Sequence, residues 1–169
     1  MRTQTTDYAK LSLDFRGEIP VRFNIATACC DRQADGTGRL ALIYVDEDGR
    51  ATRTSFDDIS EMSRRFANVL KADGLVRGDR VAVFLSQSLE VPIAHLAAFR
   101  SGMVSVPLFA LFGEDALEFR LSNSGAKAIV TDETGWEKLA KIRDRLPDLG
   151  HIYVIGDSAP AGAEPLWRS

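Results

Sequence analysis

The segment RVAVFL, residues 80–85, most constrains the fold, because it is an apolar run as long as a β-strand. A strand with one wet face alternates polar and apolar residues, whereas a strand of a parallel sheet is covered on both faces and does not alternate. Beyond residue 50, predicted strands and helices follow one another at short spacing, which favours right-handed βαβ units. We therefore predict an α/β fold: a mainly parallel sheet with helices on both faces, preceded by a β-hairpin.

The element boundaries are predicted from hydrophobic periodicity and from turn and cap residues. Residues 23–33 have helical spacing, and a hairpin is predicted with strands at 40–45 and 50–55. Ser55 and Asp58 form a capping-box-like start to a helix that runs to about residue 72. After the 80–85 strand, the predicted elements are a helix from Ser86 or Ser88 to 101, a strand at 103–109, a helix at 114–125, a strand at 126–132, a helix at 134–146 and a strand at 151–156.

Three regions are predicted along the 169 residues. Residues 1–22 lack a clear period and are expected to be irregular. Residues 23–156 are expected to form a partial α/β domain. Residues 157–169 are rich in Pro and Ala, and we expect a linker or a truncated, exposed end.

Composition excludes several partners. The formal net charge of −3 and the isoelectric point near 5.4 give no electrostatic attraction for nucleic acid or an anionic membrane. The sequence has no apolar run long enough for a membrane span and no signal-peptide core, so a cytoplasmic location is predicted. The adjacent Cys29 and Cys30 are poorly placed for a mutual disulfide, and they lack the spacing of metal ligands.

Pairs of carboxylates are candidates for acid–base chemistry, but two of the three pairs here have a simpler role. Asp57–Asp58 and Glu114–Asp115 fall in the first turn of predicted helices, where negative charge offsets the helix dipole. The pair Asp132–Glu133 is more interesting, because it ends a predicted strand at the edge where α/β proteins bind ligands. No neighbouring residue in the sequence completes a catalytic group around it.

The pattern of histidines and glycines indicates neither a catalytic base nor a phosphate-binding loop. His95 lies in an apolar predicted helix and is expected to be a hydrogen-bonded core residue, whereas His151 begins a predicted strand. Neither has a Ser or Cys at the spacing of an activated nucleophile. Gly36 and Gly38 belong to a predicted turn, since no GxGxxG or GxxxxGK[ST] motif is present. The residues alone predict no catalytic residue and no metal ligand.

The stretch FALFG, residues 109–113, is too apolar for an ordinary turn. It leads from a predicted strand into the acidic start of a predicted helix. Phe109, Leu111 and Phe112 are suited to packing a core, contacting a ligand or meeting protein outside this chain. The residues alone leave these three roles open.

Three ordered motifs resemble the N-terminal part of the AMP-forming acyl-CoA synthetases, which belong to the adenylate-forming superfamily. They are TSFDDI at 54–59, the glycine-containing helix-to-strand segment at 74–83, and Arg100-x-Gly102 followed by Pro107-Leu108. The stretch FNIA at 23–26 resembles the opening of acetyl- and medium-chain acyl-CoA synthetases. The resemblance covers roughly residues 23–156 and implies a portion of the layered αβαβα N-terminal domain of these enzymes.

The resemblance implies an acid–CoA ligase that converts a carboxylic acid and ATP to an acyl-adenylate and then to acyl-CoA, with Mg²⁺ and coenzyme A as its other requirements. The family's phosphate loop, its ribose-binding motif and its domain with the catalytic Lys are not in these 169 residues. We expect the chain to be inactive alone and to bind none of these cofactors tightly. It would be a truncated gene product, a cloned piece or one excised domain.

A coenzyme A entrance is the one site that the resemblance implies for this chain. The family's aromatic-Gly-Gly loop matches Phe109-Ala110-Leu111, which keeps the aromatic residue and departs from both glycines. The family's Arg-rich cluster beyond the next strand matches residues 134–138, where Lys138 is the one basic residue. The candidate contacts are therefore Phe109, Ala110, Leu111 and Lys138.

Two alternatives remain open from the sequence. The chain would otherwise be a piece of an aryl-acid CoA ligase or of a peptide-synthetase adenylation domain, or a stand-alone, non-catalytic α/β module that binds a partner. A piece of a larger layered domain is also expected to expose apolar surface, either on the helix at 89–101 or around residues 109–112, and to self-associate through it.

Overall fold

The computed structural model describes residues 8–15, 17, 20–156 and 159–167. In chain order its elements are helices α1 (Tyr8–Asp14) and α2 (Ile25–Cys29), the 3-10 turn η1 (Asp31–Gln33), strands β1 (Leu40–Val45) and β2 (Ala51–Ser55), α3 (Phe56–Ala72), β3 (Arg80–Phe84), α4 (Glu90–Arg100), β4 (Val104–Leu108), α5 (Glu114–Ser124), β5 (Ala128–Thr131), α6 (Glu133–Ile142), the 3-10 turn η2 (Arg143–Arg145), β6 (His151–Val154) and β7 (Glu164–Pro165). No helix within the described ranges is long and apolar enough to cross a membrane.

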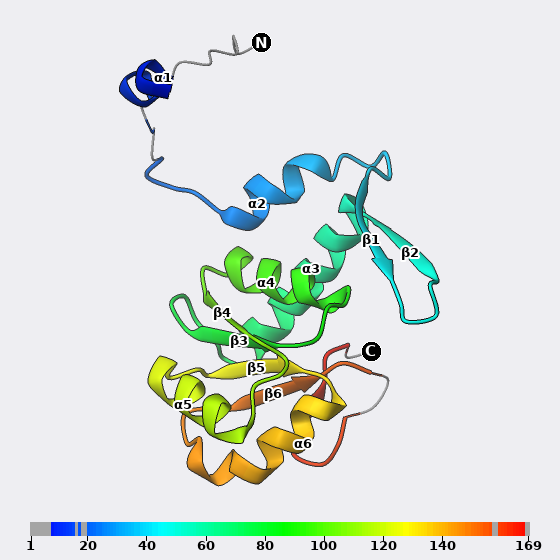
Figure 1. The fold of residues 1–169 in the computed structure, drawn as a ribbon, viewed down its shortest axis with the longest axis vertical. Helices are drawn as coiled ribbons and strands as arrows, with labels where there is room; N and C mark the ends of the chain where they lie inside the picture. Colours follow the sequence, from blue (N-terminus) through cyan, green and yellow to red (C-terminus); the bar gives the residue numbers. More distant parts are fainter. Residues whose placement is uncertain (1–7, 16, 18–19, 157–158, 168–169) are drawn as a thin grey trace.

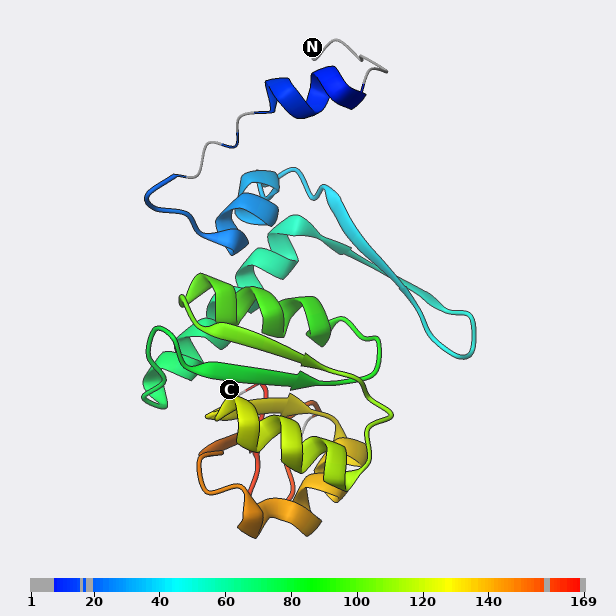
Figure 2. The same cartoon turned by 60° about the vertical axis from the view of Figure 1, so that its left-hand side comes forward.

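The predicted α/β class is confirmed. Five strands form a parallel sheet in the order β4-β3-β5-β6-β7, and β1 and β2 form a separate antiparallel hairpin. Helices α3 and α4 cover one face of the sheet, and α5 and α6 cover the other (Figures 1 and 2). The sheet is therefore the middle layer of three, as the apolar run at 80–85 predicts.

The apolar run divides its side chains between the two faces. Val81 and Val83 join the apolar cluster under α3 and α4, whereas Ala82 and Phe84 join the cluster under α5 and α6. All four are buried, which explains why the sequence shows no polar alternation here. The sheet therefore lies between two apolar cores and contributes side chains to both.

The hairpin and the start of α3 follow local sequence rules. The hairpin pairs Val45 with Ala51 beside its turn, and the ribbon extends away from the layered body (Figure 2). Ser55 caps α3: its hydroxyl accepts from the Asp58 amide, and the Asp58 carboxylate accepts from the Ser55 amide. The predicted capping box is thus confirmed, with Asp in the place of the usual Glu or Gln.

Helix α4 differs from its prediction at its first turn. It begins at Glu90 with Leu89 at the N-cap position, and no side chain caps it. The Ser88 hydroxyl is buried without a hydrogen-bond partner among the described residues. The expected cap at Ser86 or Ser88 is therefore wrong, because the chain leaves β3 through a bend before it turns into the helix. One face of α4 is buried through Ile93 and three alanines, Ala94, Ala97 and Ala98.

Two arginines make long-range contacts at the amino ends of the strands, close to the carboxyl ends of helices. Arg80 opens β3 and donates to the Ser124 and Gly125 carbonyl oxygens at the end of α5, at 2.8 and 2.6 Å. Arg100 ends α4 and binds both carboxylate oxygens of Asp31 at 2.7 and 2.8 Å. The Asp31 carboxylate also accepts from Ser60 on α3. Positive charge at helix carboxyl ends is favourable, and here it also holds η1 against α3 and α4.

Two terminal segments depart from the sequence prediction. Residues 1–22 are predicted to be irregular, yet α1 occupies seven of them. Its sequence, YAKLSLD, contains neither Gly nor Pro, so no residue in it breaks a helix. Residues 157–169 are predicted to be a linker or an exposed end, yet β7 pairs in parallel with β6, and Leu166 is buried in the core. Burial of Leu166 outweighs the poor strand propensity of a segment rich in Pro and Ala.

Candidate functional site

The 109–113 loop leaves β4 at the carboxyl edge of the sheet and enters α5. A tight turn closes the loop, in which the Phe112 amide donates to the Phe109 carbonyl oxygen at 2.9 Å. The rings of Phe109 and Phe112 meet edge to face, with centroids 5.9 Å apart. Phe112 is half-buried against the core below α5, and the Arg120 guanidinium lies over its ring at 4.1 Å. Phe112 therefore anchors the loop.

Two side chains of the loop point away from the core. Phe109 is 61% exposed and Leu111 is 79% exposed. The prediction of exposed apolar surface around residues 109–112 is confirmed for these two residues. On helix α4, the alternative location, the less buried face bears Leu96 and Phe99, which are half-buried.

Lys138 on α6 is the second anchor of the loop. Its ammonium group donates to the Ala110 and Phe112 carbonyl oxygens, at 3.2 and 3.1 Å. It also lies 5.4 Å from the centroid of the Phe84 ring, at the end of β3. The structure thus brings together the four residues that the sequence selects, Phe109, Ala110, Leu111 and Lys138. The Lys138 side chain holds the loop by binding the loop's carbonyl oxygens. The spacing of residues in the sequence did not predict this contact.

Helix α6 approaches the sheet closely at Gly135. A Cβ atom at this position would overlap the Thr131 hydroxyl and the Phe84 ring. The Thr131 hydroxyl itself donates to the Phe84 carbonyl oxygen at 3.0 Å. Asp132 caps α6 by accepting from the Gly135 amide at 2.7 Å. This close approach sets the position of Lys138, one turn farther along the helix.

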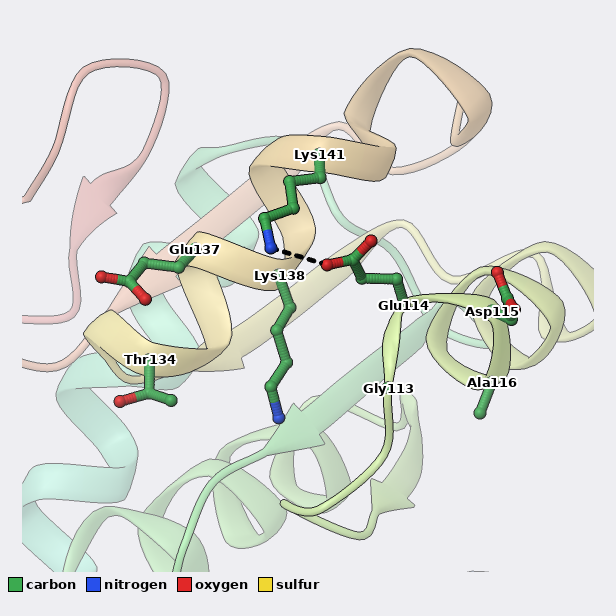
Figure 3. A pocket seen from close by; sticks show the side chains of 8 residues that line it. All are labelled: Gly113, Glu114, Asp115, Ala116, Thr134, Glu137, Lys138 and Lys141. Atoms are coloured by element: carbon green, nitrogen blue, oxygen red, sulfur yellow. Dashed lines mark hydrogen bonds and ion pairs between the residues drawn. The ribbon is translucent and has the colours of Figure 1, made fainter.

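A pocket of about 610 Å³ lies between the first turn of α5 and the side of α6 that bears Lys138 and Lys141. Figure 3 shows Lys138 and Lys141 pointing in different directions from the same helix. Lys141 donates to Glu114 at 2.8 Å, and this hydrogen bond raises the pKa of Lys141. The remaining lining residues are Gly113, Asp115, Ala116, Thr134 and Glu137.

The pocket has no free positive charge in excess of its negative charge. Its lining contains three carboxylates, on Glu114, Asp115 and Glu137, and two ammonium groups. One ammonium group binds Glu114, and the other binds loop carbonyl oxygens. The pocket therefore lacks the excess of positive charge that a polyphosphate needs.

The other candidate residues have structural partners. Asp132 serves as a helix cap, as described above, and Glu133 is the first residue of α6. His95 is half-buried, with its Nδ1 atom 2.6 Å from the Ser105 hydroxyl, and burial lowers its pKa. Cys30 is buried and Cys29 is exposed. Burial is also the main reason that the pKa of Cys30 is raised.

Comparison with known proteins assigns the family. Residues 30–168 match the model of the AMP-binding enzyme family. The acetyl-coenzyme A synthetase of Bacillus subtilis (strain 168) is 35% identical over 159 residues, which are 92% of this chain and 27% of that protein. The mitochondrial acyl-coenzyme A synthetase ACSM3 of Rattus norvegicus is 36% identical over 76% of this chain and 23% of its own length. This chain thus spans about a quarter of the relatives that it matches.

Solved structures agree with this assignment. A crystal structure of an acyl-CoA synthetase from Brucella canis superposes with a TM-score of 0.79 at 34% identity, over 95% of this chain and 29% of that chain. An anthranilate CoA ligase, AuaEII, has the same fold at 22% identity, with a TM-score of 0.76. The parallel sheet, the ordered motifs and the match over residues 30–168 lead to one conclusion: the chain belongs to the AMP-binding, adenylate-forming family and corresponds to the N-terminal portion of its acyl-CoA synthetases.

Proposed function

We propose that this chain is the N-terminal part of an acid–CoA ligase, which forms acyl-AMP from a carboxylate and ATP and then transfers the acyl group to coenzyme A. The observation that carries this proposal is the family match over residues 30–168 in a chain about a quarter as long as its relatives. A carboxylate is a poor electrophile, and adenylation turns one of its oxygens into a good leaving group. Charge on the phosphates must be stabilised for this step.

The proposed acid is a short- or medium-chain carboxylate. This choice rests on relatives named acetyl-coenzyme A synthetase and acyl-coenzyme A synthetase. An aryl acid is the alternative, and the anthranilate CoA ligase supports it by fold alone. A cytoplasmic location and a part in fatty-acid metabolism also belong to the proposal.

The residues present do not fit ATP and Mg²⁺. The sequence contains no Gly-, Ser- and Thr-rich loop with a Lys that would cradle phosphates. The pocket between α5 and α6 has more carboxylates than ammonium groups. We therefore propose that the 169-residue chain alone does not form acyl-AMP, and no catalytic step is assigned to its residues.

The residues of the 109–113 loop are better suited to an aromatic contact with coenzyme A than to binding its phosphates. Phe109 presents an exposed ring on which a nucleotide base can stack. Ala110 and Leu111 replace glycines that would let backbone approach a ligand closely. Lys138 already donates to two carbonyl oxygens, so we assign it to positioning the loop. Bound coenzyme A supplies the thiol that accepts the acyl group.

The first experiment is ATP–pyrophosphate exchange by the 169-residue chain with a panel of short, medium and aromatic carboxylates. We expect no exchange above that of a boiled sample. Robust exchange with any acid would overturn the proposed inactivity. Reading the frame downstream of residue 169 for the Gly-rich phosphate loop tests the assignment of the longer enzyme independently.

The second experiment tests Phe109 in the longer enzyme that contains this chain. We expect Phe109→Ala to raise the KM for coenzyme A about tenfold, because one base stack is worth roughly 1–3 kcal/mol. ATP–pyrophosphate exchange, which precedes the thiol step, should stay unchanged. The matched control is Phe119→Ala, which removes a similarly exposed aromatic ring on α5, outside the loop. If Phe109→Ala leaves the KM for coenzyme A unchanged, Phe109 does not contact coenzyme A and the loop serves only for packing.

A further inference from the structure

A second group of polar side chains lies at the opposite end of the parallel sheet. Asp73 follows the last residue of α3, His151 begins β6, and Glu164 begins β7. One ligand atom of each side chain lies within 4.8 Å of those of the other two. Among the residues that the structure describes, these are the only three or more His, Cys, Asp or Glu side chains that converge in this way. All three are half-buried.

One of the three spacings between these ligand atoms matches the coordination shell of a transition metal. The Nδ1 atom of His151 lies 3.4 Å from the Oε1 atom of Glu164. Zinc binds imidazole nitrogen and carboxylate oxygen at about 2.0–2.2 Å in a tetrahedral arrangement, which places neighbouring ligand atoms roughly 3.4 Å apart. One imidazole and two carboxylates suit zinc and its first-row neighbours better than Mg²⁺, which prefers oxygen ligands and octahedral geometry.

Tyr153 supports the group from the core. Its side chain is fully buried, and its hydroxyl donates to the Asp73 Oδ2 atom at 2.7 Å. Its ring stacks near the His151 ring, with centroids 6.2 Å apart and planes 10° from parallel. Tyr153 also pairs with Glu164 in the register of β6 and β7. Tyr153 therefore orients Asp73 by a hydrogen bond, as an outer-shell residue of a metal site does, and packs beside His151.

We propose that Asp73, His151 and Glu164 bind one divalent transition-metal cation, for which Zn²⁺ is the best fit, with water completing the shell. The three ligands come from α3, β6 and β7, so the cation fastens the tail strand β7 to the body of the domain. This site lies at the amino ends of the strands, whereas the 109–113 loop lies at their carboxyl ends. The proposal is therefore independent of the acid–CoA ligase proposal.

The test is titration of the metal-free 169-residue chain with Zn²⁺ by calorimetry and with Co²⁺ by visible absorption. We expect one saturable site, a rise in melting temperature with Zn²⁺, and the intense Co²⁺ bands of a four-coordinate site. Mg²⁺ at the same concentration should not compete. A folded chain that shows no saturable binding of Zn²⁺ or Co²⁺ would overturn the proposal. Asp73, His151 and Glu164 would then form a hydrogen-bonded cluster without a metal.

Variants separate this site from weak binding elsewhere. His151→Asn and Glu164→Gln should each weaken Zn²⁺ binding at least 100-fold, while circular dichroism reports that the chain stays folded. His95→Asn is the matched control, because the chain has two histidines and His95 contacts Ser105 rather than a carboxylate. Equal loss of binding in His95→Asn, or retention in His151→Asn, would place the metal elsewhere.

The variant Tyr153→Phe tests the supporting role. It removes one hydroxyl and keeps the ring in the core, so the fold should remain intact. We expect Zn²⁺ affinity to fall roughly 10–100-fold, the usual effect of losing an outer-shell hydrogen bond. Unchanged affinity would contradict the arrangement in which Tyr153 orients Asp73.

Discussion

At the carboxyl ends of the strands, two polar side chains bind backbone groups of the adjoining loop and helix. Lys138 binds loop carbonyl oxygens, and Asp132 binds an amide of α6. At the amino ends, by contrast, side-chain contacts join segments that are far apart in the sequence, as Arg100 binds Asp31 and Tyr153 binds Asp73. The first end leaves apolar residues on its surface, whereas the second ties separate helices and strands together.

This difference has a simple physical origin. In a parallel βαβ arrangement, helices start at the carboxyl ends of the strands, where free amides need local caps. Helices end at the amino ends, where the free carbonyl oxygens at the end of α5 accept from Arg80, while Arg100 at the end of α4 binds the Asp31 carboxylate. At the carboxyl edge Asp132 supplies such a cap for α6, while Phe109 and Leu111 stay exposed to further protein or a ligand. The amino edge is stabilised by long-range contacts, and its loss should unfold more of the chain.

The largest expected effect of a single substitution is at Gly135. Gly135→Val places side-chain atoms where the Thr131 hydroxyl and the Phe84 ring lie, so α6 must move off the sheet. Overpacking of this kind costs about 3 kcal/mol of unfolding free energy, which urea denaturation measures. Gly113→Ala is the control, because a Cβ atom there has no neighbour within 4 Å and its φ of −79° suits any residue. Equal losses in both variants would mean that close packing at α6 is unimportant.

At the amino edge, Asp31→Asn should destabilise the chain by about 2 kcal/mol at pH 7, because Arg100 keeps its charge and loses its counter-charge. The Asp31–Arg100 pair is mostly buried, with side-chain exposures of 17% and 14%. The control is Asp48→Asn, which removes the partner of Arg50 in an exposed pair and should have little effect. If Asp31→Asn lowers the free energy of unfolding no more than the control does, the Asp31–Arg100 pair contributes little to the stability of the chain.

The same pair predicts a dependence on pH. The hydrogen bond from Arg100 is the main reason that the pKa of Asp31 lies well below its ordinary value. A carboxyl group with a lowered pKa in the folded state stabilises that state above its unfolded pKa, and the contribution is lost as pH falls toward the folded pKa. We expect stability to decline below about pH 5 in the native chain and less steeply in Asp31→Asn, as followed by urea denaturation from pH 7 to pH 3. Parallel pH profiles would contradict this assignment.

A smaller effect is expected at the carboxyl edge for Lys138→Met. The change removes two hydrogen bonds to loop carbonyl oxygens and keeps the aliphatic stem, at a cost of about 1 kcal/mol. Hydrogen exchange should become faster at the Phe112 amide, whose partner is the Phe109 carbonyl oxygen. Lys141→Met is the control, since Lys141 contacts Glu114 and no loop carbonyl. Unchanged exchange in Lys138→Met would mean that the loop closes without the lysine.

The smallest effect on stability is expected for the exposed apolar pair. Phe109→Ser combined with Leu111→Ser should leave the free energy of unfolding nearly unchanged, because both side chains are mostly in solvent. If this surface mediates self-association, light scattering at high concentration should show less dimer in the double variant than in the native chain. Ile43→Ser on the exposed hairpin is the control. A native chain that stays monomeric at all concentrations would contradict self-association through this surface.

Much of the fold was predictable because it depends on local rules. The apolar run at 80–85 predicts a strand covered on both faces, and the structure has β3 there with helices on each side. The Ser55–Asp58 capping box and the hairpin turn likewise involve residues near each other in sequence. The candidate loop was predictable as well, since Phe109 and Leu111 are apolar residues in a position that usually carries Gly or Asn.

What the sequence by itself determined is therefore the layered α/β class, the order of most elements and an unusual apolar loop at the sheet edge. Tertiary structure alone decided that Leu166 draws the tail into the sheet, that Lys138 reaches the loop carbonyl oxygens, and that Asp73, His151 and Glu164 converge. Periodicity and caps act over a few residues, so they are readable in a single chain. Contacts between distant segments depend on which surfaces are buried together, and no local pattern records that choice.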